Sequence, residues 1–130
     1  MTGLSVYGSY IYVSSVSQKC CYRYTAPSIT GRYAYTTYGG LAGTRDIAMD
    51  GSTGWVWVAC NSTSYPIRAY KSGICQFILD TTVVPYAYGL TIDPDGYLWV
   101  SDEQNDVIYQ VDPYATSLTP ATWGRIKASF

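Results

Sequence analysis

The chain of 130 residues contains no histidine and little charge. Without histidine it can form neither a Ser/His/Asp nor a Cys/His catalytic site, and it has no histidine general base. Charged residues make up 13% of the sequence and the net charge is −1, so there is no basic stripe to attract nucleic acid or an anionic membrane. We therefore expect neither a nucleic acid nor a membrane as a partner.

Long apolar runs are also missing. No segment approaches the roughly 18–20 residues that span a bilayer. Residues 1–13 have neither a basic region nor an uninterrupted apolar stretch, so they do not resemble a signal peptide. The low charge, the 15 tyrosines and the glycosylation sequon at Asn61 favour an extracellular or periplasmic location without deciding the compartment.

The four cysteines lack CxxC spacing, and the sequence has no histidine. We therefore do not expect a structural zinc site. Cys20 and Cys21 are adjacent and would point to opposite faces of a strand. Cys60 and Cys75 stand alone. Two disulfides and four free thiols both remain compatible with the sequence.

What the sequence has instead is an internal repeat with a period of about 43 residues. Its three blocks recur three times each: 3–7, 46–50 and 89–93; 10–14, 55–59 and 97–101; 21–24, 67–70 and 108–111. The blocks are rich in β-branched and aromatic residues, and turn residues such as Asp93-Pro94-Asp95-Gly96 separate the first block from the second. Fourth strands are predicted at Tyr33–Tyr38, Gln76–Leu79 and Thr122–Lys127. We therefore expect an all-β protein of three four-stranded units.

Residues 89–112, GLTIDPDGYLWVSDEQNDVIYQVD, resemble a repeat of the NHL, SMP-30/gluconolactonase and virginiamycin B lyase-like β-propellers. The resemblance is close over 88–112, fair over 45–70 and loose over 3–24. It implies a β-propeller built of four-stranded blades. It does not specify an activity, because such blades occur in lyases, lactonases and binding scaffolds alike.

Three blades, at about 2–44, 45–87 and 88–130, account for nearly the whole chain, whereas propellers close with four to eight blades. An arc of three blades leaves two sheet faces that expect a neighbour. We expect the chain to close a six-bladed ring as a homodimer, since six is the usual number in the families it resembles. The alternatives are a truncated part of a longer propeller and a self-sufficient monomer with another fold.

In such a propeller Thr2, Arg45 and Tyr88 begin the innermost strands and surround one mouth of the central channel. Arg45 and Tyr88 are therefore candidates for ligand binding, as is Asp46, although Arg45 and Asp46 could instead form a local ion pair. Tyr12, Trp57 and Trp99 occupy equivalent positions, which predicts packing between blades. The less regular tyrosines, Tyr33, Tyr35, Tyr38 and Tyr86, are further binding candidates.

A polar loop carries the remaining candidates, Asp102, Glu103 and Asn105. The SMP-30-like lactonases hold a divalent cation with carboxylates and an Asn near the channel. Their Asn-Gly-Leu motif corresponds to Tyr88-Gly89-Leu90 here, with Tyr in place of Asn, whereas Asp102 matches the Asp after their second strand. The resemblance thus implies at most a divalent-cation site, such as calcium, on Asp102 with Glu103; otherwise we expect no cofactor and two solvated carboxylates.

Lack of histidine, lack of a paired-acid motif and low charge favour a non-catalytic binding module. Its channel mouth and inter-strand loops would be presented to a peptide, a glycan or a small ligand. One alternative is a metal-dependent lactonase- or lyase-like enzyme with carboxylates around Asp102. Another is a structural, truncated or engineered propeller fragment without a ligand.

Overall fold

The computed structural model describes residues 1–38, 41, 43–114 and 125–126, which contain twelve strands and no helix. The strands form three antiparallel sheets of four strands each, with neighbours that follow the chain order. Their bounds are β1 Leu4–Tyr7, β2 Tyr10–Ser15, β3 Cys20–Thr25 and β4 Thr30–Thr37 in the first sheet; β5 Thr44–Asp50, β6 Trp55–Cys60, β7 Ile67–Lys71 and β8 Ile74–Leu79 in the second; β9 Ala87–Ile92, β10 Leu98–Asp102, β11 Val107–Val111 and β12 Arg125–Ile126 in the third.

This arrangement confirms the predicted all-β class and the three four-stranded units. The fourth strand of each unit is present, but β4 and β8 begin earlier than the sequence suggested. The predicted strand at 122–127 is described only at Arg125–Ile126, and its other residues lie outside the described part of the chain. Two of the predicted repeat boundaries fall one residue inside a strand, since β5 begins at Thr44 and β9 at Ala87.

The turn at Asp93–Gly96 shows how local sequence positions the strands. Gly96 has a φ of 89°, a left-handed conformation that glycine adopts without steric cost, and its N–H donates to the Asp93 carbonyl at 3.0 Å. The Asp93 carboxylate accepts the N–H groups of Asp95 at 2.9 Å and Tyr97 at 3.0 Å. These residues form the predicted turn, so Asp93 and Asp95 serve local structure there.

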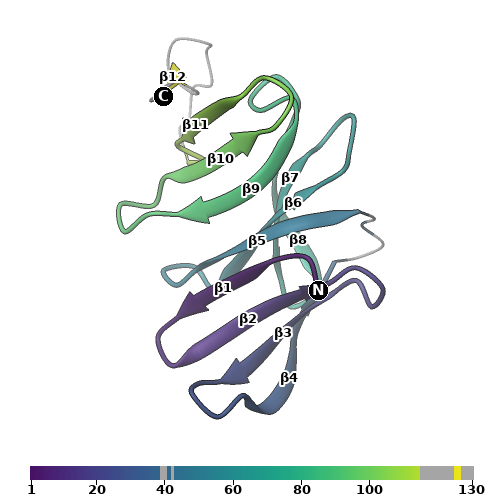
Figure 1. Cartoon of the computed structure of the whole chain (residues 1–130), viewed down its shortest axis with the longest axis vertical. Coiled ribbons are helices and arrows are strands. Elements are labelled where there is room, and N and C mark those ends of the chain that lie inside the picture. Colours follow the sequence, from purple (N-terminus) through teal and green to yellow (C-terminus); the bar gives the residue numbers. More distant parts are fainter. Residues whose placement is uncertain (39–40, 42, 115–124, 127–130) are drawn as a thin grey trace.

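The three sheets follow one another along the molecule, with β1 beside β5 and β5 beside β9 (Figure 1). Side chains tie these strands together across the sheets. Ser5 Oγ in β1 accepts the N–H of Met49 in β5 at 3.0 Å, and Asp46 Oδ2 in β5 accepts the N–H of Leu90 in β9 at 2.8 Å. β1, β5 and β9 therefore form one continuous row of strands, called here the inner wall.

Each sheet has two chemically different faces, because side chains alternate along a strand and residues paired across strands share a face. One, called here the aliphatic face, carries the non-aromatic apolar residues of the first two strands of each sheet: Leu4, Val6, Ile11 and Val13; Ile47, Met49, Val56 and Val58; Leu90, Ile92, Leu98 and Val100. The other, called the aromatic face, carries Tyr12, Trp57 or Trp99.

The core consists of two joints in which an aliphatic face packs on an aromatic face. The aliphatic face of the second sheet forms a buried cluster with Tyr12 and Cys21 of the first sheet. The aliphatic face of the third sheet forms a second cluster with Trp57 and its neighbours in the second sheet. The same pairing is thus used twice in succession.

Two faces at the ends of the row have no neighbouring sheet among the described residues. On the aliphatic face of the first sheet, Leu4 is 55% and Val6 is 62% exposed, whereas their equivalents Ile47 and Met49 are 1% and 6% exposed. On the aromatic face of the third sheet, Trp99 is half-buried. The predicted packing role therefore holds for Tyr12 and Trp57, whereas Trp99 belongs to neither buried cluster of the described part of the chain.

The four thiols are all free, so of the two cysteine alternatives the structure has unpaired cysteines. Cys20, Cys21 and Cys60 are buried, and Cys75 is exposed. Burial raises the pKa of the Cys21 thiol to about 12, so it behaves as an inert core residue. None of the described residues forms a helix of the length and apolarity that crossing a membrane requires.

Candidate ligand-binding site

Two β-bulges at equivalent positions shape one end of the inner wall. In β5 the register with β6 shifts between Thr44 and Asp46, which leaves Arg45 as the extra residue. The pairing of β9 with β10 shifts at the equivalent place, where Tyr88 and Gly89 lie opposite Ser101. Bulges redirect side chains and are common beside functional sites. The equivalent residues of the first sheet, Thr2 and Gly3, precede β1 and both bond to Ser14: the Thr2 N–H donates to the Ser14 carbonyl at 3.3 Å, and the Ser14 N–H donates to the Gly3 carbonyl at 3.0 Å.

Arg45 and Tyr88 lie together as a consequence. The Arg45 guanidinium carbon is 5.2 Å from the centroid of the Tyr88 ring, within the range of a cation–π contact. Arg45 Nη1 donates to the Ala87 carbonyl at 3.0 Å and Nη2 donates to Asn61 Oδ1 at 3.2 Å. Three neighbours thus hold the guanidinium in one orientation, and none of them is charged.

Asp46 makes different contacts from Arg45, its neighbour in the chain. Asp46 Oδ1 accepts the N–H of Ile47 at 2.9 Å, and Oδ2 accepts the N–H of Leu90. Oδ2 therefore joins β5 to β9 while Oδ1 bonds within β5, and Asp46 has a structural role alongside its place at the site.

A cavity of about 350 Å³ opens at this end, called here the Arg45 cavity. It is lined by Met1, Thr2, Gly3, Leu4, Arg45, Asp46, Tyr88 and Gly89. The structure thus brings together three of the residues singled out from the sequence, Arg45, Asp46 and Tyr88. Gly3 and Gly89 allow close packing at the cavity wall. A Cβ on Gly3 would lie 2.7 Å from Asp46 Oδ1, and a Cβ on Gly89 would lie 2.8 Å from Ser101 Oγ.

A second hollow of about 420 Å³ adjoins the first, because Arg45 lines both. Its other walls come from the β6–β7 loop, the segment before β9 and the β10–β11 loop, including Asn61, Tyr86 and Gln104. Arg45 therefore stands between the end of the inner wall and the loops around it. Tyr86 belonged to the sequence candidates, whereas the 43-residue pattern gave no signal for Gln104.

The loop with Asp102, Glu103 and Asn105 stabilises itself. Asp102 is buried, and its Oδ1 accepts the N–H groups of Gln104 and Asn105, each at 3.0 Å. Its Oδ2 accepts the side-chain amide of Asn105 at 2.9 Å. Glu103 is exposed. Asp102 thus closes the turn between β10 and β11, and the described residues contain no group of three or more Cys, Asp or Glu side chains that could hold a metal ion.

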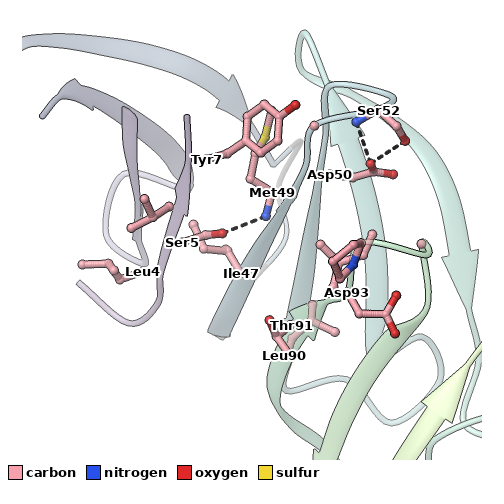
Figure 2. Close-up of a pocket in the computed structure, with 15 residues that line it drawn as sticks. Leu4, Ser5, Tyr7, Ile47, Met49, Asp50, Ser52, Leu90, Thr91 and Asp93 are labelled. Atoms are coloured by element: carbon pink, nitrogen blue, oxygen red, sulfur yellow. Dashed lines mark hydrogen bonds between the residues drawn. The ribbon is translucent and has the colours of Figure 1, made fainter. Parts of the chain in front are cut away.

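The opposite end of the inner wall has a cavity of about 660 Å³ (Figure 2). Tyr7, Asp50 and Asp93, which occupy equivalent positions at the ends of β1, β5 and β9, all line it. The Tyr7 ring lies against Gly51, where any larger residue would collide with it. This cavity was not among the sequence candidates, although the shared register of these three positions could have indicated it.

Asp50 and Asp93, the two acids of the 660 Å³ cavity, are held as carboxylates by local hydrogen bonds. Burial opposes ionisation of Asp50, but donors from Ser52, Thr53 and Tyr114 outweigh it and lower its pKa. The Trp99 indole N–H donates to Asp93 Oδ2 at 2.9 Å and is the main cause of the lowered Asp93 pKa. A general acid needs a raised pKa, so neither side chain is tuned for that role.

No protein-family model matches this sequence, and a search of curated proteins finds no match either. The resemblance of residues 89–112 to propeller repeats therefore stays a prediction. What identifies the candidate site is its geometry: an oriented arginine and an exposed tyrosine, both placed by bulges, at the edge of a cavity.

Proposed function

We propose that the chain is half of a six-bladed β-propeller, that it closes the ring with a second copy of itself, and that the closed ring is a non-catalytic binding module. In this proposal each four-stranded sheet is one blade, and β1, β5 and β9 line the central channel. The Arg45 cavity then lies at one channel mouth, where a ligand would bind.

One observation carries the proposal: the face that is buried in the second and third sheets is exposed in the first. Val6 and Met49 are equivalent residues, yet Val6 is 62% exposed and Met49 is 6% exposed. Fully burying an aliphatic side chain stabilises by about 1.5–3 kcal/mol. Leaving this whole face in water is therefore costly, and a partner that covers it would recover that free energy.

The other uncovered face has the chemistry of the missing partner. Within the chain, an aliphatic face packs twice against an aromatic face. Among the described residues no sheet covers the aliphatic face of the first sheet or the aromatic face of the third. On the latter Thr91, Trp99 and Gln110 pair across the strands, as do Ser101 and Ile108. The Asp93 carboxylate lies beside them and accepts the Trp99 indole N–H, so the charge of Asp93 is hydrogen-bonded within this face. A second copy would thus supply the matching face at both ends.

Two copies joined in this way are related by a twofold axis, and both joints are identical. The joint uses different faces of the two copies, so it generates a closed ring only when the rotation between successive sheets brings the last one back to the first. Six sheets satisfy the four to eight that propellers use. Arg45 would then occur twice, in the middle sheet of each half and on opposite sides of the channel.

The test is a matched pair of arginine substitutions, Val6→Arg and Ile74→Arg. Both residues are β-branched and similarly exposed, at 62% and 64%, but Ile74 lies on the outermost strand of the second sheet, outside the proposed joints. We expect Val6→Arg to halve the molar mass measured by light scattering and to keep the β-sheet circular dichroism spectrum. Ile74→Arg should retain the parent mass.

Equal masses for the two variants and the parent would overturn the proposal, since a ring cannot keep its joint with an arginine in the centre of it. A mass that rises with concentration without reaching a plateau would also overturn it. That behaviour belongs to an open filament, in which the same faces meet but the ring does not close.

A further inference from the structure

We infer that the Arg45 cavity binds a ligand with a singly charged carboxylate group, which Arg45 recognises beside the Tyr88 ring. This inference rests on the proposed binding role of that end of the inner wall, and it names the chemical class of the ligand. The oriented guanidinium and its uncompensated charge are the observations that carry it.

Arg45 is oriented before any ligand arrives. An arginine side chain has five N–H donors. Two hydrogen bonds, to the Ala87 carbonyl and to Asn61 Oδ1, hold the planar group while the Tyr88 ring lies 5.2 Å away. Such preorganisation reduces the entropy lost on binding, and the donors that remain can meet a carboxylate in the two-point geometry typical of arginine.

The charge of Arg45 is also uncompensated by its hydrogen-bond partners. Arg45 is half-buried, and both acceptors around it are neutral. Asp46, the acid that shares the cavity, uses its two oxygens on the backbone N–H groups of Ile47 and Leu90. A partly desolvated cation with no paired anion among the described residues is costly, so an incoming carboxylate would gain more here than at a fully solvated arginine.

The same Asp46 favours a single negative charge on the ligand. Its carboxylate lines the cavity together with Arg45, and it would repel an anion with two charges more strongly than one with a single charge. Phosphate at neutral pH carries between one and two charges, whereas a carboxylate carries one. Tyr88 is 48% exposed and offers an aromatic surface for the apolar part of the ligand.

Benzoate and benzamide are the probes, because they share a shape and differ in charge. We expect the parent protein to bind benzoate and to show at least tenfold lower affinity for benzamide, measured by titration with detection of backbone amide shifts. The largest shifts should come from Arg45, Tyr88 and Gly89. Inorganic phosphate at matched ionic strength should bind at least tenfold more weakly than benzoate.

Three variants test whether Arg45 itself binds the carboxylate or whether any positive charge on the protein would attract it. Arg45→Gln should lower the benzoate affinity at least tenfold, and Arg45→Lys should restore only part of it because lysine lacks the planar two-point donor. Arg68→Gln is the matched control: Arg68 is also half-buried and lies 5.9 Å from the ring of Tyr65, but it does not line the cavity. Its benzoate affinity should stay within twofold of the parent.

Equal affinity for benzoate and benzamide, an unchanged affinity in Arg45→Gln, or tighter binding of phosphate would each overturn the inference. The molar mass of every sample is measured in parallel. A dimer that binds no benzoate would refute this inference and leave the ring proposal standing. A monomer that binds benzoate through Arg45 would refute the ring and leave the carboxylate site standing.

Discussion

The aliphatic faces of the first and second sheets are built from equivalent residues but have opposite surroundings. Leu4 and Val6 are 55% and 62% exposed, whereas Ile47 and Met49 are 1% and 6% exposed. The strands that carry them have the same order and the same antiparallel pairing. The difference lies in the neighbour, because the second sheet has the Tyr12 face of the first sheet against it.

Strand formation therefore depends on local sequence, whereas burial of a sheet face depends on a neighbouring sheet. Alternation of side chains and turn residues determine where the strands and turns of each sheet lie. Burial of its aliphatic face needs another sheet, as in other repeat proteins, where each unit is stabilised mainly by its neighbours. Substitutions on the covered face and on the exposed face should therefore have separate effects.

The largest effect should come from placing a charge at equivalent positions of the two faces. Met49→Arg buries an unpaired cation in the joint between the first and second sheets, which should destabilise the fold by at least about 4 kcal/mol. Val6→Arg should change the free energy of unfolding of a single copy by less than about 0.5 kcal/mol, because Val6 is exposed there. Urea denaturation measures both.

This comparison needs protein concentrations well below the Kd of the proposed dimer. Loss of the second copy then does not contribute to the free energy measured for Val6→Arg. Similar destabilisation by the two substitutions under those conditions would mean that the face of the first sheet is already covered within one chain.

A smaller effect should follow from loosening the covered joint itself. A Cβ at position 3 would lie 2.7 Å from the Ile47 backbone nitrogen and 2.8 Å from the Asp46 Cα, so Gly3→Ala should push β1 away from β5. Because these two contacts are with backbone atoms, we expect a loss of about 2–3 kcal/mol by thermal or urea denaturation. Gly8→Ala is the control for loss of a glycine, since its Cβ would meet no atom within 4 Å.

Gly8 has a φ of 58°, so alanine at position 8 carries only a backbone cost of about 1 kcal/mol. If Gly8→Ala proves as damaging as Gly3→Ala, close contact between β1 and β5 is not what holds the first sheet in place.

The joint between the second and third sheets offers a pH-dependent test. The Tyr114 hydroxyl, just after β11, donates to Asp50 Oδ2 at 2.9 Å. Tyr114→Phe should cost about 1 kcal/mol at neutral pH, because it removes a hydrogen bond to a carboxylate. Asp50 has a lowered pKa, so the stability it contributes is present above its ordinary pKa of 3.8 and is lost as the pH falls through the lowered value.

The difference between Tyr114→Phe and the parent should therefore narrow in acid, as followed by urea denaturation at several pH values. A difference that stays constant from neutral pH to below the ordinary carboxyl pKa would show that Tyr114 stabilises the joint through ring packing alone.

The smallest effect is a change in the Asp93 pKa, which we expect from substituting the half-buried Trp99 but not from substituting the buried Trp57. Trp99 donates its indole N–H to Asp93, whereas the indole N–H of the buried Trp57 has no partner among the described residues. Trp99→Phe should raise the Asp93 pKa, measured by NMR titration of the carboxyl carbon. Trp57→Phe should leave that pKa unchanged, and a shift of equal size in both variants would contradict the local cause.

Much of the fold could be predicted from the sequence, because its determinants are local. The turn at Asp93–Gly96, the strands at residues 10–14 and 55–59, and the equivalence of Arg45 with Tyr88 all follow from short-range patterns. The length of β4 was underestimated because the exposed segment Thr30–Arg32 has no buried side chains and therefore little hydrophobic signal.

The contacts at the candidate site could not be predicted in the same way. Asp102 reads as a free loop carboxylate in the sequence, but its oxygens accept three hydrogen bonds from Gln104 and Asn105. The contact of Arg45 with Asn61 joins residues from different strands and loops. Such partners depend on side-chain geometry in three dimensions, which residue periodicity does not encode.

The absolute molar mass of the unmodified chain in solution tests the central claim most directly. Two copies in a closed ring predict a single species at about twice the 14.3 kDa of one chain, with a mass that does not increase further with concentration. A stable monomer of 14.3 kDa at high concentration would contradict the account, because the face of Leu4 and Val6 would then need no partner.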